Sequence, residues 1–251
     1  MRAGRRRSTG RVALRAAATA LAAASVALLV ACGAPASPGD GAAPAGEFPD
    51  GWAAGGPPDD DATTVAAFYG DSYTRGTGVS DPSRRWSTIL SEDRGWAEFN
   101  PSVDGLGFVN NRDLLAPGED LVDRIVGLDP EPDVVLVTMG LNDNFSMPTL
   151  ADEIRTAIGR DLARLRDELP DARIVVVEPF WYTDDRPASV EEIIGWVEDA
   201  AAEVGAGHIP GASRWLEGQP EWMAADGIHP NDDGHAEMAR RMDAELERLG
   251  L

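Results

Sequence analysis

The sequence predicts an α/β fold, in which a central parallel sheet is flanked by helices. Two of its strand segments, Asp133–Met139 (DVVLVTM) and Arg173–Glu178 (RIVVVE), are continuous apolar runs. Runs that do not alternate with polar residues are typical of strands covered on both faces. Segments with helical spacing separate the strands along the chain, which favours parallel pairing.

The other elements follow from the same patterns. Val65–Tyr69 (VAAFY) is a short buried run that ends at Gly70, and Ala97–Asn100 is a further candidate strand. In a parallel sheet, ligands gather at the carboxyl ends of the strands, so the segments that follow these runs are candidates for a site. The expected helices are Arg85–Arg94, Leu121–Leu128, Leu150–Leu169, Val190–Val204 and Asp233–Leu249.

Residues 1–31 have the pattern of a secretory signal. Six arginines and no acid precede an uncharged apolar run over residues 16–31, which is shorter than the roughly 20 residues of a spanning helix. The segment Leu29–Cys32 resembles a bacterial lipobox, so we expect cleavage before Cys32 and a diacylglyceryl group on its thiol. The alternative is an ordinary signal peptide, or an uncleaved anchor, that contains a cysteine.

Residues 32–62 are rich in Ala, Pro, Gly and Asp, and this composition predicts a disordered tether. Phe48 and Trp52 are its candidates for docking onto the domain, although the composition favours no docking. Residues 63–251 have the size of a single domain. The chain would therefore be extracytoplasmic, either lipid-anchored to the bacterial cell membrane through Cys32 or secreted.

The charge of the chain is strongly acidic. It has 22 basic residues, all arginine, and 43 acidic ones, a net charge of −21; without the six arginines of the signal, 16 basic residues remain, a net charge of −27. Such a surface repels nucleic acid and anionic lipid headgroups, so we expect no nucleic-acid partner. The single cysteine excludes an intrachain disulfide and a multi-cysteine metal site.

Three short motifs contain residues that can do chemistry. Gly70-Asp71-Ser72 follows the first strand, and Asp226-Gly-Ile-His229-Pro precedes the last helix. A histidine oriented by a carboxylate can take the proton of a serine hydroxyl and make it a nucleophile. Taken alone, Ser72 also fits a helix N-cap, and Asp226 with His229 also fits a capping residue beside a surface histidine.

Gly140-Leu-Asn142-Asp143, at the end of the clearest strand, is the third motif. The Asn142 amide can donate a hydrogen bond to a developing oxyanion. Glycine and asparagine are also common turn residues, so an ordinary turn is the alternative.

In their order and spacing, the three motifs resemble the signature blocks of the SGNH/GDSL hydrolases, over about Val65 to Leu249. A further block, a glycine after the second strand, resembles Asn100-Pro-Ser-Val-Asp-Gly105-Leu-Gly107. Gly105 is the better match and Gly107 the second candidate. This stretch departs from the commoner Gly-Gly pairing, because Asp104 precedes Gly105.

The resemblance implies a three-layer α/β/α sandwich with a central parallel sheet, of flavodoxin-like type, and an acyl-serine mechanism without a cofactor or a metal. Ser72 would be the nucleophile, His229 the base and Asp226 its orienting acid. The oxyanion donors would be the Ser72 and Gly105 N–H groups and the Asn142 amide. Substrates would be small-molecule, lipid or glycan esters, and we expect a monomer. The alternatives are an O-acyltransferase on the same residues and a non-catalytic, carbohydrate-binding surface module.

Further residues stay outside these motifs. We expect His208 to be structural and His235 to lie on the surface of the last helix. Trp181 and Tyr182 fall at the predicted site edge, where they could line a pocket or pack in the core. The acids and histidines between Asp226 and His235 could also be interpreted as a metal site. This is the less favoured interpretation, because a Ser-His-Asp triad already accounts for two of them, Asp226 and His229.

Overall fold

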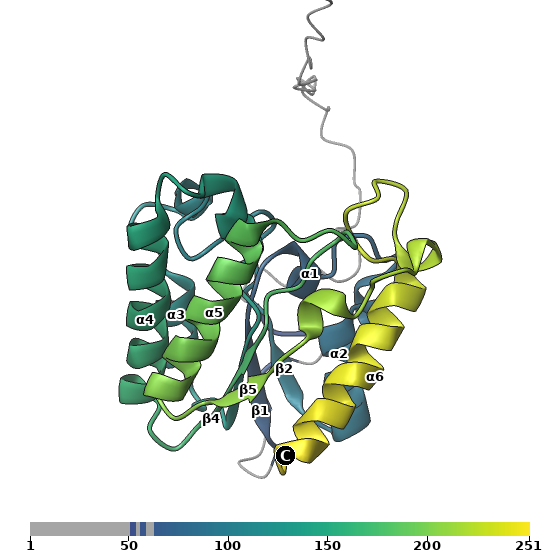
Figure 1. Cartoon of the computed structure of the whole chain (residues 1–251). Coiled ribbons are helices and arrows are strands. Elements are labelled where there is room, and N and C mark those ends of the chain that lie inside the picture. The colour runs from purple at the N-terminus through teal and green to yellow at the C-terminus, as the bar shows by residue number, and fades with distance from the viewer. Residues whose placement is uncertain (1–50, 54–55, 59–62) are drawn as a thin grey trace, which may run out of the picture. The chain divides into compact units, whose positions relative to one another are not determined.

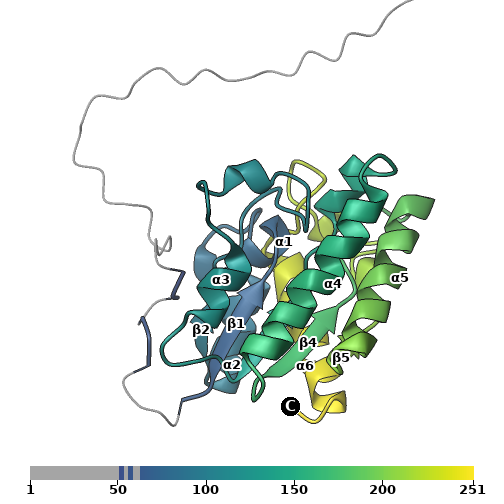
Figure 2. The ribbon, with the colours of Figure 1, turned by 90° about the vertical axis from the view of Figure 1, so that its left-hand side faces the viewer.

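The computed structural model describes residues 51–53, 56–58 and 63–251, and the predicted signal, Cys32 and Phe48 lie outside them. Within this part, five parallel strands form one sheet in the order β2-β1-β3-β4-β5 (Figures 1 and 2). The predicted α/β class with a central parallel sheet is confirmed. The strands are β1 (Val65–Tyr69), β2 (Ala97–Phe99), β3 (Val134–Val137), β4 (Arg173–Val177) and β5 (Gly207–Ile209).

Helices cover both faces of the sheet. Those named α3, α4 and α5 pack on one face, and α2 and α6 pack on the other (Figure 1). The short helix α1 follows β1 directly at the end of the sheet. The helices are α1 (Ser72–Arg75), α2 (Trp86–Arg94), α3 (Leu121–Val126), α4 (Ala151–Glu168), α5 (Ala188–Glu203) and α6 (Asp232–Arg248).

The continuous apolar composition of the strands follows from this arrangement. In β3, Val135 and Val137 belong to the core under α3, α4 and α5, whereas Val134 and Leu136 belong to the core under α2 and α6. Both sets of side chains are almost fully buried. A strand that faces a helical layer on each side has no position for a polar residue, as the sequence predicts.

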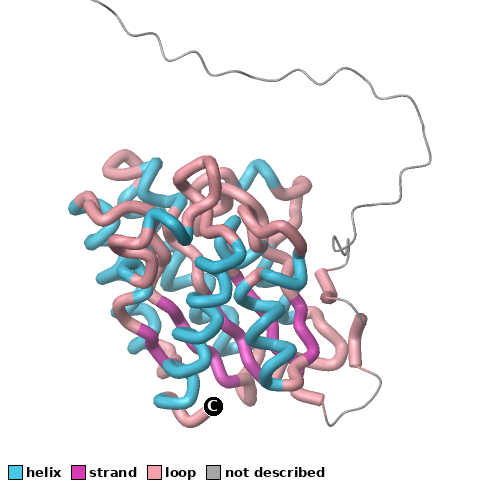
Figure 3. Tube along the Cα trace, turned by 90° about the vertical axis from the view of Figure 1, so that its right-hand side faces the viewer, coloured by secondary structure: helices cyan, strands magenta, loops and turns pink. Residues whose placement is uncertain are grey.

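All strands run in the same direction, so their carboxyl ends share one edge of the sheet. Tyr69 of β1 pairs with Val137 of β3, and the next residues along the chain lead to Ser72 and to Asn142. Figure 3 shows loops gathered beyond this edge of the strands. The register of two neighbouring strands therefore brings together motifs that are about 70 residues apart in the sequence.

The structure corrects the predicted boundary of the tether at residue 62. Trp52 is 7% exposed and packs edge-on against Phe99, with ring centroids 5.4 Å apart. Backbone hydrogen bonds join Gly51 to Asn100 and Ala53 to Glu98 along the edge strand β2. Residues 51–53 therefore belong to the folded domain. The Trp52 ring packs on Phe99, and the backbone of these residues bonds to the edge of β2.

His235 is a second correction. We expected a surface residue, yet its side chain is fully buried on the inner face of α6. It shares this face with Met238, Ala239 and Met242, at the spacing of a helix face that packs on a core. No helix among the described residues is long and apolar enough to cross a membrane.

Candidate active site

Ser72 lies at the first position of α1, at the carboxyl end of β1. Asp71 caps this helix, because its carboxylate accepts the Tyr73 N–H at 3.0 Å. The other end of the helix is held by Asn100, whose side-chain amide donates to the Thr74 carbonyl at 2.8 Å. A four-residue helix has little stability of its own, so these contacts fix the backbone that carries Ser72.

The structure brings Ser72, His229 and Asp226 together. His229 Nδ1 lies 2.7 Å from Asp226 Oδ2, and His229 Nε2 lies 3.0 Å from Ser72 Oγ. A carboxylate can only accept, so Nδ1 carries the imidazole proton and Nε2 is left to accept the Ser72 O–H. In this arrangement the imidazole can take the hydroxyl proton without moving.

Asp226 is held ionised. Its pKa is lowered to about 2, first by the hydrogen bond from the His229 side chain and then by the backbone N–H of His229; the Ile228 N–H adds to the effect. The loop itself is tied to α1, because the Tyr73 hydroxyl donates to the Ile228 carbonyl. Asp226 therefore keeps its negative charge beside the imidazole throughout the neutral range.

Asn142 follows β3 and begins the 3₁₀ helix η3 (Asn142–Ser146). Its Nδ2 donates to Asp71 Oδ2 at 3.2 Å and to the Leu106 carbonyl at 3.0 Å. The side chain is almost buried, and these two acceptors fix the direction of its amide. Asn142 thus contacts both the residue before Ser72 and the loop that carries Gly105.

The structure distinguishes Gly105 from Gly107. The Gly107 N–H donates to the Asn110 carbonyl at 2.9 Å, so it already has a partner. Gly105 has a φ of +74°, and in the described part of the chain its N–H, like that of Ser72, has no hydrogen-bond acceptor. Only Gly105 of the two glycines therefore has an N–H that remains for a ligand.

Asp143 holds the loop that contains Gly105 and Gly107 in place. Its fully buried carboxylate accepts three backbone N–H groups, from Phe108 at 2.7 Å, Val109 at 2.8 Å and Asn110 at 3.1 Å. From the sequence, Asp143 is expected only as the last residue of the Gly140–Asp143 motif, without a role of its own. The sequence could not show this role, because the partners of the carboxylate are backbone N–H groups, which every residue except proline has.

Asp71 is the other buried acid of the site. Its pKa is raised to about 7, chiefly by burial and to a smaller extent by the charges of Asp143 and Asp104, against the lowering effect of the Tyr73 N–H. The Asn142 amide is its neighbour on the remaining carboxyl oxygen. The site therefore contains a carboxyl group that titrates near neutral pH.

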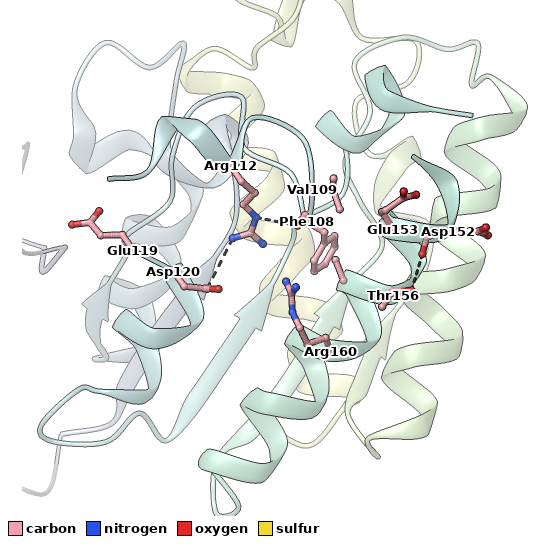
Figure 4. A pocket seen from close by; sticks show the side chains of 10 residues that line it. Phe108, Val109, Arg112, Glu119, Asp120, Asp152, Glu153, Thr156 and Arg160 are labelled. Atoms are coloured by element: carbon pink, nitrogen blue, oxygen red, sulfur yellow. Dashed lines mark hydrogen bonds and ion pairs between the residues drawn. The ribbon is translucent and has the colours of Figure 1, made fainter. Parts of the chain in front are cut away.

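A separate cavity of about 680 Å³ lies between α4 and the segment 108–120 that precedes α3 (Figure 4). Arg112 projects into it and donates from Nε to the Phe108 carbonyl at 3.0 Å, while Arg160 extends from α4. Neither Ser72 nor His229 lines this cavity. It is therefore distinct from the arrangement around the Ser72 hydroxyl.

The other residues named from the sequence have structural surroundings. Trp181 packs in the core under α2 and α6, with Tyr182 against its ring at a centroid distance of 4.6 Å. The buried His235 accepts the Trp86 N–H on Nδ1 at 3.3 Å. Across the described residues, no group of three or more Asp, Glu, His or Cys side chains is placed to hold a metal ion.

Comparisons with solved structures agree with the fold. The psychrotrophic esterase EstA from Pseudoalteromonas sp. is 15% identical and superposes with a TM-score of 0.57, over 74% of this chain and 98% of that one. A family two carbohydrate esterase from Cellvibrio japonicus is 17% identical, with a TM-score of 0.59 over 74% of this chain and 61% of that one. At these identities the likeness establishes the fold alone.

Comparison of sequences gives a nearer relative. The GDSL lipase Rv0518 of Mycobacterium tuberculosis is 33% identical over 189 residues, which are 70% of this chain and 78% of the relative. The sequence profile of the GDSL-like lipase/acylhydrolase family matches residues 68–237, a segment that contains Ser72, Asn142 and His229. Because this match covers well over half of the chain, the protein belongs to the GDSL-like lipase/acylhydrolase family.

Proposed function

We propose that this ester-bond hydrolase works through an acyl-serine intermediate formed on Ser72. The observation that carries the proposal is the continuous hydrogen-bonded line from Asp226 through His229 to the Ser72 hydroxyl, with distances of 2.7 and 3.0 Å. A hydroxyl becomes an effective nucleophile when a neutral imidazole accepts its proton. The ionised Asp226 supports the imidazolium that forms.

In this mechanism a residue of the site is assigned to each proton transfer and each bond change. Ser72 Oγ attacks the ester carbonyl and its proton passes to His229 Nε2. The tetrahedral oxyanion accepts hydrogen bonds from the Ser72 N–H and the Gly105 N–H. The Asn142 amide becomes the third donor when its longer hydrogen bond, the one to Asp71 Oδ2 at 3.2 Å, is exchanged for one to the oxyanion. As the C–O bond of the ester breaks, His229 returns the proton to the departing alcohol. Water, deprotonated by the same imidazole, attacks the acyl group and releases the acid and the Ser72 hydroxyl.

Three exposed apolar side chains support an ester with an apolar acyl or alcohol part. Among the described residues, the large apolar side chains that are exposed are Leu114 (55%), Phe145 (61%) and Ile228 (44%). Ile228 precedes His229, Phe145 lies in η3 with Asn142, and Leu114 adjoins Gly105. Exposed apolar groups that cluster around a site are typical of contact with an apolar ligand.

Hydrolysis of p-nitrophenyl acetate, butyrate and octanoate by the full chain and by Ser72→Ala tests both statements. We expect wild-type activity that increases with acyl length and a fall to background in the variant, together with fluorophosphonate labelling of Ser72. Turnover that persists in Ser72→Ala would exclude the serine mechanism. Labelling without turnover of any of the three esters would favour acyl transfer.

We further propose that the chain is exported and attached to a membrane by a diacylglyceryl group on Cys32. The support is the basic segment, the apolar run and the single cysteine of the N-terminal sequence. Metabolic labelling with a tagged fatty acid and fractionation of producing cells test it, with Cys32→Ala as the control. Equal amounts of wild type and Cys32→Ala in the membrane fraction would contradict it.

A further inference from the structure

Asp104, which directly precedes Gly105, reaches across to the segment that follows the Ser72 helix. Its Oδ2 accepts a hydrogen bond from Arg75 Nη1 at 2.9 Å, and its Oδ1 accepts one from the Thr77 hydroxyl at 2.6 Å. Both carboxylate oxygens are thus used on one short stretch of chain. Asp104 and Arg75 remain about half exposed, so this is a surface contact.

The stretch that Asp104 holds borders two other parts of the site. The Thr77 N–H donates to the Ser72 carbonyl at 2.9 Å, which ties it to α1. At the next residue, Gly78, an added Cβ would lie 2.2 Å from the Pro230 carbonyl oxygen, so this stretch also packs against the loop of His229. Asp104 therefore links the Gly105 loop to a segment that contacts the surroundings of both Ser72 and His229.

Side chains hold the loop at Gly105 and on both sides of it. At Gly105 itself, the carbonyl accepts a hydrogen bond from the Asn111 side-chain amide at 2.8 Å. Asp143 holds the loop after Gly105 through the N–H groups of residues 108–110. Asp104 is the corresponding anchor immediately before Gly105. Of these contacts, only those of Asp104 join the loop directly to the segment that follows the Ser72 helix, so Asp104 relates the position of the Gly105 N–H to that of Ser72.

We propose that Asp104 is a positioning residue for the ester hydrolysis, which keeps the Gly105 N–H directed at the oxyanion through its contacts with Arg75 and Thr77. The inference rests on the proposed acyl-serine mechanism. A negative charge so near a developing oxyanion is unfavourable unless it is neutralised. The Arg75 guanidinium and the Thr77 hydroxyl satisfy the carboxylate, so Asp104 can orient the loop without this cost.

Asp104→Asn separates positioning from stability. Half-exposed ion pairs contribute little to folding, so the thermal unfolding midpoint should stay within about a degree of the wild type. Misdirection of a donor that acts in the transition state lowers kcat with little change in KM. We expect kcat to fall by at least about 10-fold, less than the ~10²–10³-fold loss for complete removal of such a donor.

Asp243→Asn is the matched control. Asp243 accepts from Arg94 at 2.7 Å between α2 and α6 and is 44% exposed, close to the 47% of Asp104. We expect wild-type kcat for this variant. Thr77→Val removes one donor to Asp104, and its effect on kcat should not add to that of Asp104→Asn, since both variants break one contact.

Fluorophosphonate labelling of Ser72 gives a second readout, because the phosphoryl oxygen takes the place of the oxyanion. The labelling rate of Asp104→Asn should fall in parallel with kcat. If Ser72→Ala is inactive but Asp104→Asn keeps wild-type kcat and labelling rate, the inference about Asp104 is wrong while the mechanism stands. If Ser72→Ala keeps its activity, the mechanism fails and the inference with it.

Discussion

The side-chain amide of Asn142 donates a hydrogen bond to the buried carboxyl group of Asp71, with Nδ2 and Oδ2 3.2 Å apart. This contact joins the turns that follow β1 and β3 and places a titratable group beside the amide. Burial, with the charges of Asp143 and Asp104, raises the pKa of Asp71 to about 7. The orientation of Asn142 is thus coupled to a group that changes charge near neutral pH.

Asp71→Asn should change the pH dependence of stability. The pKa of Asp71 is higher in the fold than its ordinary value of 3.8. The wild type therefore loses stability at this position as pH rises from about 4 to about 7, because ionisation is opposed by burial. The variant lacks this loss, so its unfolding midpoint should rise relative to the wild type between pH 5 and pH 8. Thermal unfolding followed by circular dichroism measures it; an offset that stays constant with pH would contradict the assignment.

Asp226→Asn should inactivate the enzyme without unfolding it. The amide can present its NH₂ group to His229 Nδ1, which favours the tautomer whose Nε2 carries the proton and no longer accepts the Ser72 hydroxyl. We expect kcat to fall by about 10⁴-fold. Asp226 is nearly half exposed, so the unfolding transition should change little. Ester hydrolysis and fluorophosphonate labelling check this, and a variant with near-normal labelling would show that Asp226 does not orient the imidazole.

His235 should make the fold sensitive to acid. Burial lowers its pKa from 6.5 to about 4. Between these two pH values His235 is protonated in the unfolded chain but not in the folded one. The free energy of unfolding therefore decreases as pH falls from about 6.5 to about 4. His235→Asn keeps an acceptor for the Trp86 N–H and removes this loss, although the space it leaves costs stability at every pH. Urea unfolding should show a deficit of the variant at pH 7.5 that shrinks at pH 4.5, and a deficit that grows would contradict the explanation.

The long elements were predictable because their periodicity is carried by many residues. The strand β3 and the helix α4 agree with the expected segments to within two residues at each end. A strand start before His208 and a helix start at Ser72 were expected, but no range was predicted for the three-residue strand β5 or the four-residue helix α1, since so short a segment has no period of its own. Their conformation comes from neighbours, such as the pairing of β5 with β4.

The site was predictable as a set of motifs but not as a set of contacts. Ser72, Asn142 and His229 follow from residue type and spacing, and parallel register explains why two of them meet. That Asp143 anchors the Gly105 loop depends on backbone N–H groups, which carry no sequence signal. The burial of His235 did have one, because Met238 and Met242 share its helix face, but the acids beside it favoured a surface position.

Two glycine-to-alanine substitutions should have opposite effects. At Gly107 a Cβ would lie 2.6 Å from both carboxylate oxygens of Asp143, whereas at Gly159, inside α4, nothing lies within 4 Å of it. Gly159→Ala should raise the free energy of unfolding by about 0.5–1 kcal/mol, because alanine loses less backbone entropy in a helix. Gly107→Ala should lower it by roughly 1–3 kcal/mol.

The same pair of variants tests whether the hydrogen bonds of Asp143 to its loop affect catalysis as well as stability. To make room, Gly107→Ala must displace Asp143 from the N–H groups of Phe108 and Val109, and this displaces Gly105. We therefore expect kcat to fall in Gly107→Ala and to stay at the wild-type value in Gly159→Ala, with urea unfolding and ester hydrolysis measured on the same samples. If Gly107→Ala loses stability but keeps its kcat, the anchoring by Asp143 serves the fold and not the oxyanion donors.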